Sequence, residues 1–119
     1  MESEAAIERA ILKYLNARDD CLAFKYGVKA KHGKGRGFNA NGIADIVVNY
    51  QVSEMCFVIY MEVKHKTGKQ RATQYEFEQN IKNLSGLYYI VRSVEDAENA
   101  LKDARQEIGN NIKIAQIPW

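Results

Sequence analysis

Two strongly apolar stretches of this chain each carry charged residues where a buried strand would be purely apolar. The first, residues 42–48, is interrupted by Asp45, and the second, residues 56–61, ends in Glu62-Val63-Lys64. Burying an isolated carboxylate is very costly unless it is paired or binds a metal. Because side chains alternate along a strand, Glu62 and Lys64 share one face. The two stretches therefore predict neighbouring strands that carry a charged site.

A hairpin between the two stretches fixes which residues lie opposite each other. If the chain turns at Ser53-Glu54, Asp45 lies directly across from Glu62. Like charges directly opposite each other on paired strands repel, and a divalent cation between them would remove the repulsion. Mg²⁺ is commonly held by one or two carboxylates together with waters and phosphate. We therefore predict a metal site at Asp45 and Glu62, and the alternative is two edge-strand acids that point into water.

The net charge of +2 hides an uneven distribution along the chain. Residues 25–71 contain nine Lys/Arg and three Asp/Glu, whereas the rest contains eight basic and twelve acidic residues. A basic field around an acidic centre suits a polyanion, and the alternative is a solvated basic face without a partner. A nucleic acid would be one such polyanion, and we would expect its recognition by shape and phosphate, because no base-reading element is visible. The expected contacts are Lys29, Lys31, Lys34, Arg36, Lys66, Lys69 and Arg71.

Hydrophobic periodicity predicts an α/β fold in which a central mixed β-sheet is flanked by helices. The expected element order is α-β-β-β-α-β-α-β, with Ser3 as the N-cap of the first helix. After the first three strands come a helix, a nearly all-apolar strand of parallel type and a third helix. A last edge strand is expected around Ile112, Ile114 and Ile117. The helices are expected over residues 3–17, 71–84 and 93–108, and the strands over 22–28, 42–48, 56–64 and 87–91.

The length of 119 residues predicts one domain spanning residues 1–119. No stretch of about 18 apolar residues is present, so we expect no membrane partner. The N-terminal Met1-Glu2-Ser3-Glu4 lacks the basic-then-apolar pattern of a secretory signal. These features predict a cytoplasmic location.

A strand acid followed by acid-x-Lys on the next strand resembles the pattern of the PD-(D/E)xK nuclease superfamily. The stretch from Gly42 to Asp96 is similar to the virus-type replication-repair nuclease domain, VRR-NUC, and the first helix and strand also fit its layout. Stand-alone members of that family are small phage and bacterial proteins related to archaeal Holliday-junction resolvases. The resemblance implies a restriction-endonuclease-like fold with an α-β-β-β-α-β core. It is carried by Gly42, Asp45, Glu62-Val63-Lys64, Gly68, Gln74 and the stretch Val91-Arg92-Ser93-Val94-Glu95-Asp96. It also implies a bacterial or phage-infected host cell as the location.

The resemblance implies a role for each matching residue. Asp45, Glu62 and the backbone carbonyl of Val63 would bind Mg²⁺ or Mn²⁺. Lys64 would orient or activate the attacking water and stabilise charge at phosphorus, and Gln74 would position the site. A glutamate of the first helix would complete it, and we expect Glu8 in this role. Glu4, one turn earlier on the same face, is the competing choice.

Non-catalytic interpretations of the same residues stay open. Lys64 could simply neutralise Glu62, Gln74 could be an ordinary first-turn residue, and Glu8 could be a solvated acid. The two histidines, His32 and His65, lack the paired spacing of a metal site and are expected in loops or near phosphates.

Two positions differ from the usual pattern of the family. Ala44 stands where the family usually has Pro, and Arg71 stands where it often has a Ser helix cap. Arg71 adds a candidate phosphate contact at the start of its helix.

Together these observations predict a metal-dependent endonuclease that hydrolyses phosphodiester bonds in branched DNA such as Holliday junctions. By analogy with the related resolvases, we expect a homodimer. The alternatives are a flap or nicking nuclease, a catalytically silent DNA-binding module with the nuclease fold, and a protein-interaction domain that docks through its basic face.

Overall fold

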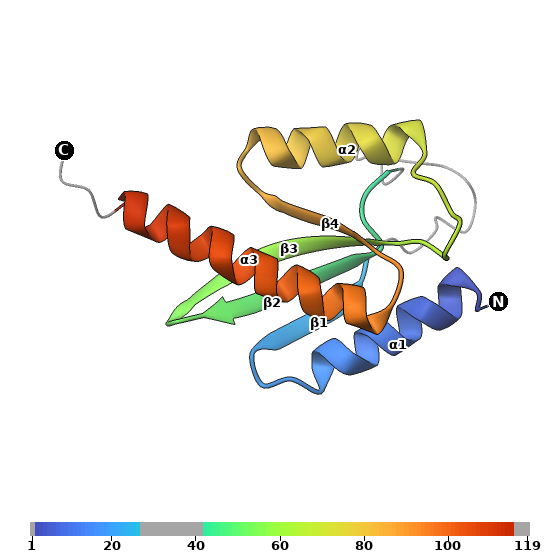
Figure 1. The fold of residues 1–119 in the computed structure, drawn as a ribbon, viewed down its shortest axis with the longest axis horizontal. Helices are drawn as coiled ribbons and strands as arrows, with labels where there is room; N and C mark the ends of the chain where they lie inside the picture. The colour runs from blue at the N-terminus through green and yellow to red at the C-terminus, as the bar shows by residue number, and fades with distance from the viewer. Residues whose placement is uncertain (1, 27–41, 116–119) are drawn as a thin grey trace.

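The computed structural model describes residues 2–26 and 42–115, with side chains up to residue 113. Three helices and four strands follow one another along the described chain (Figure 1). In chain order they are α1 (Glu4–Asn16), β1 (Cys21–Lys25), β2 (Ile46–Val52), β3 (Met55–Val63), α2 (Ala72–Asn83), β4 (Leu87–Val91) and α3 (Val94–Ala115).

The four strands form one mixed sheet in the order β1-β2-β3-β4. The first two pairs are antiparallel, and β4 lies parallel to β3. Ile46 pairs with Met61 at one end of the β2–β3 hairpin, and Val52 pairs with Met55 beside the turn. Extending this register by one residue places Asp45 across from Glu62, so the predicted register is confirmed.

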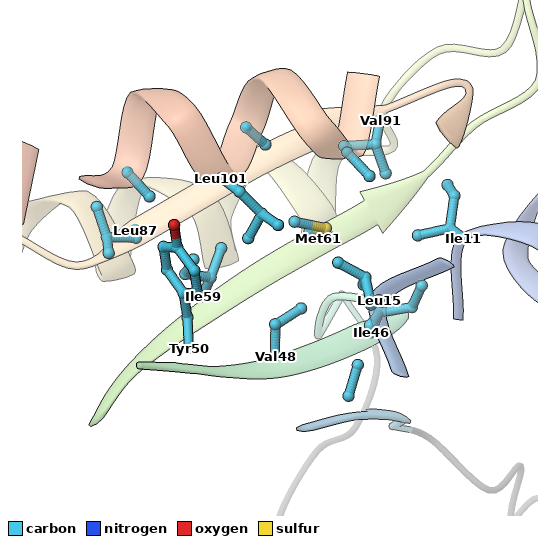
Figure 2. Packing of buried hydrophobic residues seen from close by; sticks show 14 of the residues in the cluster. Ile11, Leu15, Ile46, Val48, Tyr50, Ile59, Met61, Leu87, Val91 and Leu101 are labelled. Carbon is cyan, nitrogen blue, oxygen red and sulfur yellow. The ribbon is translucent and has the colours of Figure 1, made fainter. Parts of the chain in front are cut away.

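One face of the sheet packs against α1 and α3 and forms the hydrophobic core. Ile59, Met61 and Val63 of β3 point to this face and are almost completely buried. Figure 2 shows Ile11 and Leu15 of α1 and Leu101 of α3 directed toward the same strands. Their apolar spacing of three and four residues explains why both helices present a continuous stripe to the sheet.

The opposite face is covered differently, because α2 lies over only part of it. Phe77 of α2 contacts Tyr60 of β3 edge-on, with ring centroids 5.2 Å apart, and also meets Tyr88 of β4 at 6.0 Å. Side chains of β3 that point to this face include Val58, Tyr60 and Glu62. The buried charged residues therefore lie on the α2 face, opposite the hydrophobic core.

The helix ends and one sheet edge show specific local hydrogen bonds. Ser3 caps α1, as predicted, because its hydroxyl accepts the amide proton of Ala6 at 3.1 Å. The side-chain amide of Asn16 exchanges two hydrogen bonds of 2.8 Å with the backbone of Ala23. Asn16 thus occupies part of the outer edge of β1 in the way a neighbouring strand would.

The C-terminal part of the fold corrects one prediction. Residues 112–115 belong to α3, so the edge strand expected around Ile112, Ile114 and Ile117 does not form there, and Ile117 lies outside the described residues. Ile112 follows Ile108 by four residues and packs partly against the core, which continues the helical stripe. The expected helix end at Ile108 is wrong for the same reason.

Strand boundaries also differ from the expected ones. β1 ends at Lys25, and residues 27 and 28 of the predicted strand lie outside the described part. β2 begins at Ile46 and continues to Val52, so Asp45 directly precedes the strand.

The fold is therefore α/β, with a four-stranded mixed sheet flanked by three helices, as predicted. This arrangement is compatible with a restriction-endonuclease-like fold. None of the helices in the described ranges has the length and apolar character needed to cross a membrane.

Candidate active site

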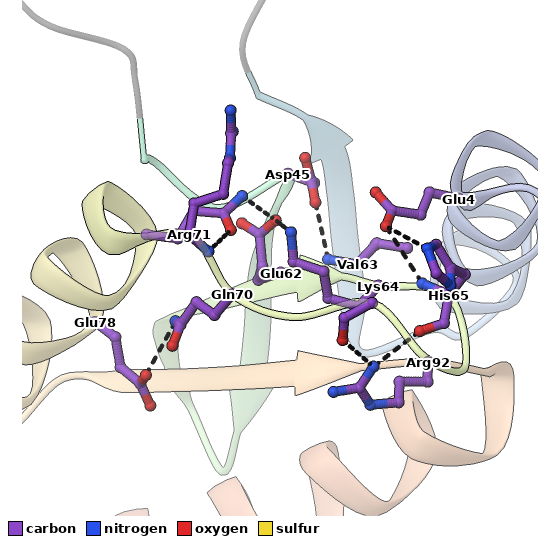
Figure 3. A network of polar contacts seen from close by, with 12 residues as sticks. Glu4, Asp45, Glu62, Val63, Lys64, His65, Gln70, Arg71, Glu78 and Arg92 are labelled. Atoms are coloured by element: carbon purple, nitrogen blue, oxygen red, sulfur yellow. Dashed lines mark hydrogen bonds and ion pairs between the residues drawn. The ribbon is translucent and has the colours of Figure 1, made fainter.

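Asp45 and Glu62 meet at the end of the β2–β3 hairpin that lies away from its turn. Asp45 is half-buried, and its Oδ2 accepts the backbone N–H of Val63 at 2.8 Å. The backbone carbonyl of Asp45 accepts the N–H of Tyr26 at 2.8 Å, which continues the β1–β2 pairing. The Asp45 side chain thus takes a place that a backbone partner occupies elsewhere in the ladder, and this fixes it beside β3 (Figure 3).

Glu62 is a buried carboxylate that shares this space with Asp45. It is 1% exposed, and no donor among the described residues reaches its buried Oε1 atom. Burial, followed by the neighbouring Asp45 carboxylate, raises the pKa of Glu62 to about 8, against the opposing effect of Lys64. A buried carboxylate oxygen without a donor is strongly disfavoured unless a cation or proton occupies the space.

Lys64 follows two residues later on the same face and reaches back to Glu62. Its Nζ atom lies 3.6 Å from Glu62 Oε2, and the residue is only 6% exposed. Its backbone N–H is donated to Val91 of β4 at 3.0 Å, which fixes the strand end. A buried lysine beside a carboxylate pair is a compact positive charge held close to the two acids.

Gln74, in the first turn of α2, links the helix to Glu62. The backbone N–H of Arg71 donates to Gln74 Oε1 at 2.8 Å, and Gln74 Nε2 donates to Glu62 Oε2 at 2.8 Å. A backbone N–H can only donate, so the amide orientation of Gln74 is fixed. Gln74 is 4% exposed, and it both closes the N-terminal turn of α2 and orients the Glu62 carboxylate.

Gly42 explains how α2 can approach the strand acid so closely. Its φ angle is +87°, and a Cβ atom there would lie 2.4 Å from the backbone oxygen of Thr73. Only glycine adopts this conformation and this approach without strain. The glycine three residues before Asp45 therefore sets the position of the helix turn that carries Gln74.

Val63 follows Glu62 in the chain, and its backbone N–H and carbonyl face the side of β3 on which Asp45 lies. The β2–β3 pairing ends at Ile46 and Met61, so Val63 extends beyond the last backbone pair. In an extended strand the N–H and C=O of one residue point to the same side, and the Val63 N–H faces Asp45. The carbonyl predicted as a metal ligand is therefore directed toward the same edge as Asp45.

The structure separates the two glutamates of α1. Glu8 pairs with Lys25 of β1 at 3.3 Å, and Lys25 lies on the core face of the sheet, opposite Glu62. Glu4 instead accepts the backbone N–H of His65 at 3.4 Å, directly after Lys64, and its Oε2 lies 3.9 Å from His65 Nε2. Of the two acids, Glu4 is the one that contacts the residues directly after β3.

Arg92 is a further residue of this region, one that belongs to the stretch carrying the family resemblance but for which the sequence predicted no role. Its Nη1 atom donates to the carbonyls of His65 and Gly68, each at 2.8 Å (Figure 3). These bonds hold the turn that follows Lys64, which is also closed by a bond from Gly68 N–H to the His65 carbonyl. The sequence signal is only an arginine after a buried strand, so these long-range contacts could not be foreseen.

The predicted DNA-contacting residues fall into two groups. Lys29, Lys31, Lys34 and Arg36 lie outside the described residues, as does His32. Lys66, Lys69 and Arg71 are exposed and follow β3 toward the start of α2. They therefore lie on the segment that joins the carboxylate-bearing end of β3 to α2.

The residues present fit a hard divalent cation. Glu62 Oε1 is buried without a donor, Asp45 has an oxygen outside its bond to Val63, and both acids supply the oxygen ligands that Mg²⁺ prefers. Across residues 2–26 and 42–113, no group of three or more His, Cys, Asp or Glu side chains is arranged to hold a metal ion. A cation here would draw its remaining ligands from backbone, water or a bound phosphate.

Comparisons with known proteins do not add a family assignment. A scan against protein-family models and a search of curated proteins both return no match to this chain.

Proposed function

We propose that this chain is a Mg²⁺- or Mn²⁺-dependent endodeoxyribonuclease that hydrolyses phosphodiester bonds in branched DNA such as Holliday junctions. The observation that carries the proposal is the buried carboxylate of Glu62 beside the half-buried Asp45, with Lys64 Nζ 3.6 Å from Glu62. A domain that only bound DNA would gain nothing from placing a buried carboxylate beside a second acid. The proposal includes membership of the VRR-NUC group within the PD-(D/E)xK nucleases.

The chemistry assigned to the site follows from its residues. Asp45, Glu62 and the Val63 carbonyl would hold the cation. When bound, such a cation neutralises negative charge on the phosphate and lowers the pKa of a water that it binds. Lys64 would place its positive charge beside the attacking water and the non-bridging oxygens of the phosphate. Gln74 would keep Glu62 in one orientation, and Asp45 would keep the strand end fixed through the Val63 N–H.

The charge distribution supports a polyanionic substrate. Lys66, Lys69 and Arg71 are exposed on the segment that follows the carboxylate end of β3, and none of them has a carboxylate within ion-pair distance among the described residues. Such side chains release counterions when they contact phosphates, so binding should weaken steeply as salt increases. The homodimer would place two such sites on one branched substrate.

The test is cleavage of a labelled four-way junction beside linear duplex, single strand and a flap, each with Mg²⁺ or Mn²⁺. We expect metal-dependent cleavage that prefers the junction and is abolished by Lys64→Ala. The matched control is Lys102→Ala, because Lys102 is an exposed lysine of α3. Preference for the flap would reassign the substrate to a flap nuclease. Binding without cleavage of any substrate would contradict the enzymatic proposal and indicate a silent DNA-binding module.

A further inference from the structure

Two large apolar side chains of β1 are exposed on the sheet. Leu22 is 65% exposed and Phe24 is 47% exposed, whereas Ala23 between them points into the core. Val58 of β3 is also 44% exposed. Contiguous apolar surface of this kind commonly marks a place where another molecule binds.

The strand register places these side chains on the same face as the two carboxylates. Leu22 pairs with Asn49 and Phe24 pairs with Val47, while the backbone of Tyr26 continues the pairing to Asp45. Opposed residues and residues two apart share a face, so Phe24 and Val47 lie one row from Asp45 and Glu62. The distance between such rows is about 7 Å, so the side chains of the two rows are neighbours on the sheet.

Helices of the described chain leave this part of the sheet uncovered. The core residues of α1 and α3 pack on the opposite face, and the aromatic contacts of α2 reach Tyr60 and Tyr88 of β3 and β4. The patch consists of the exposed Leu22, Phe24 and Val58, with Asn49 between Leu22 and Val58 and the buried Val47 beside Phe24. None of these five residues is acidic. The patch is therefore an apolar platform that begins directly beside the carboxylate pair.

The charges at the end of the platform indicate which kind of molecule covers it. Lys64 is beside the carboxylates, and Lys66, Lys69 and Arg71 are exposed further along the chain. A nucleic-acid strand has anionic phosphates for the basic end and flat apolar bases for the platform. Bases inside a duplex are already stacked, so only unpaired bases offer a free face to an aromatic side chain.

We propose that Leu22 and Phe24 form a binding platform for unpaired nucleobases next to the phosphodiester bond that is cut. This inference rests on the proposed nuclease function and deepens it by naming the feature of branched DNA that the site selects. Contact with base faces is independent of sequence, so it selects unpaired structure rather than a particular base.

The test is binding without divalent metal to three substrates of equal length. They are a duplex with a short unpaired stretch at a branch, the same DNA with abasic nucleotides in that stretch, and a fully paired duplex. We expect the wild type to bind the base-bearing branched DNA about tenfold more tightly than the abasic form. Phe24→Ala should lose this difference, Phe24→Trp should keep it, and the control Leu84→Ala, at an exposed position of similar chemistry, should match the wild type.

The outcomes separate failure of the platform from failure of the nuclease function. Equal wild-type affinity for base-bearing and abasic DNA, together with Lys64-dependent cleavage, would overturn the platform and leave the nuclease. If the wild type neither binds nor cuts DNA, both the platform proposal and the nuclease proposal are contradicted. A third result that overturns the platform is a change from dimer to monomer in sedimentation of Phe24→Ala with base preference intact, because the patch would then join two copies of the chain.

Discussion

The two faces of β3 differ sharply in what they bury. On the α1 and α3 side, Ile59, Met61 and Val63 lie in an apolar core with few polar atoms. On the α2 side, Glu62 and Lys64 are equally buried, whereas Val58 is exposed. Alternation along one strand thus separates the residues that stabilise the fold from those that carry charge. The comparison supports the proposal of a functional site on the α2 face, because buried charges there do not contribute to an apolar core.

The core face should show the largest effect on stability when it is altered. Ile59→Ala is expected to lower the free energy of unfolding by about 3–4 kcal/mol, because it removes buried methyl groups and leaves a cavity. Val58→Ala on the other face should cost under about 0.5 kcal/mol because the side chain is exposed. Chemical denaturation of the two variants measures the difference, and equal losses would contradict the assignment of the faces.

Disturbing the close approach of Gly42 to α2 should give the next largest loss in the free energy of unfolding. Gly42→Ala is expected to lower the free energy of unfolding by about 2–3 kcal/mol. The alanine would have to adopt a positive φ angle, and its Cβ would clash with the backbone oxygen of Thr73. Gly109→Ala in α3 is the control, since a Cβ there meets nothing within 4 Å and alanine favours a helix. A Gly42→Ala protein as stable as the wild type would show that the helix turn is not held against the strand.

The α2 face should reveal its charge through the pH dependence of stability without metal. The pKa of Glu62 is raised to about 8, so its favourable contribution is present at low pH and is lost as the pH rises through that value. Glu62→Gln keeps a neutral group at every pH, and its amide can donate toward Asp45. We expect it to match the wild type near pH 5 and to be about 2 kcal/mol more stable at pH 9.

Denaturation of both proteins at the two pH values measures this effect, with Glu54→Gln in the exposed hairpin turn as the control. A Glu62→Gln protein that loses stability at pH 9 would indicate that the glutamate is ionised and well paired in the fold. In that case the buried acid would be a structural ion pair with Lys64.

The turn after β3 should depend on Arg92. Arg92→Gln removes the two 2.8 Å bonds to the carbonyls of His65 and Gly68 and is expected to cost about 1–2 kcal/mol. Hydrogen exchange should show faster opening at Gly68, whose N–H closes the same turn. Arg9→Gln on the exposed side of α1 should change neither quantity. Unchanged exchange at Gly68 in Arg92→Gln would contradict the positioning role.

Much of the site follows from local patterns, and the exceptions have physical reasons. The two-residue turn at Ser53-Glu54 fixes the hairpin register, so the opposition of Asp45 and Glu62 could be predicted. The contacts of Arg92 and Glu4 with the turn after β3 join segments far apart in the chain, and no short pattern encodes them. The residues that lie opposite each other in the hairpin were therefore predictable from the sequence, whereas the contacts between distant segments of the chain were not.

The prediction of a C-terminal edge strand was wrong for a different reason. Ile112, Ile114 and Ile117 fit both a strand and the end of a helix, since isoleucine favours strands and the spacing is mixed. The continuing stripe from Ile108 to Ile112 decides for the helix, because it packs against the core. Tertiary contacts thus outweighed the local preference.

The most direct test of the account is Mn²⁺ binding to the carboxylate pair, followed by calorimetry and by electron paramagnetic resonance. We predict that the wild type and Glu54→Gln bind Mn²⁺ equally, and that Asp45→Asn binds it at least about tenfold more weakly. Affinity should increase as the pH rises toward 8, because Glu62 must lose a proton to bind the cation. Equal binding by Asp45→Asn and the wild type would contradict the central claim that Asp45 and Glu62 form a metal site.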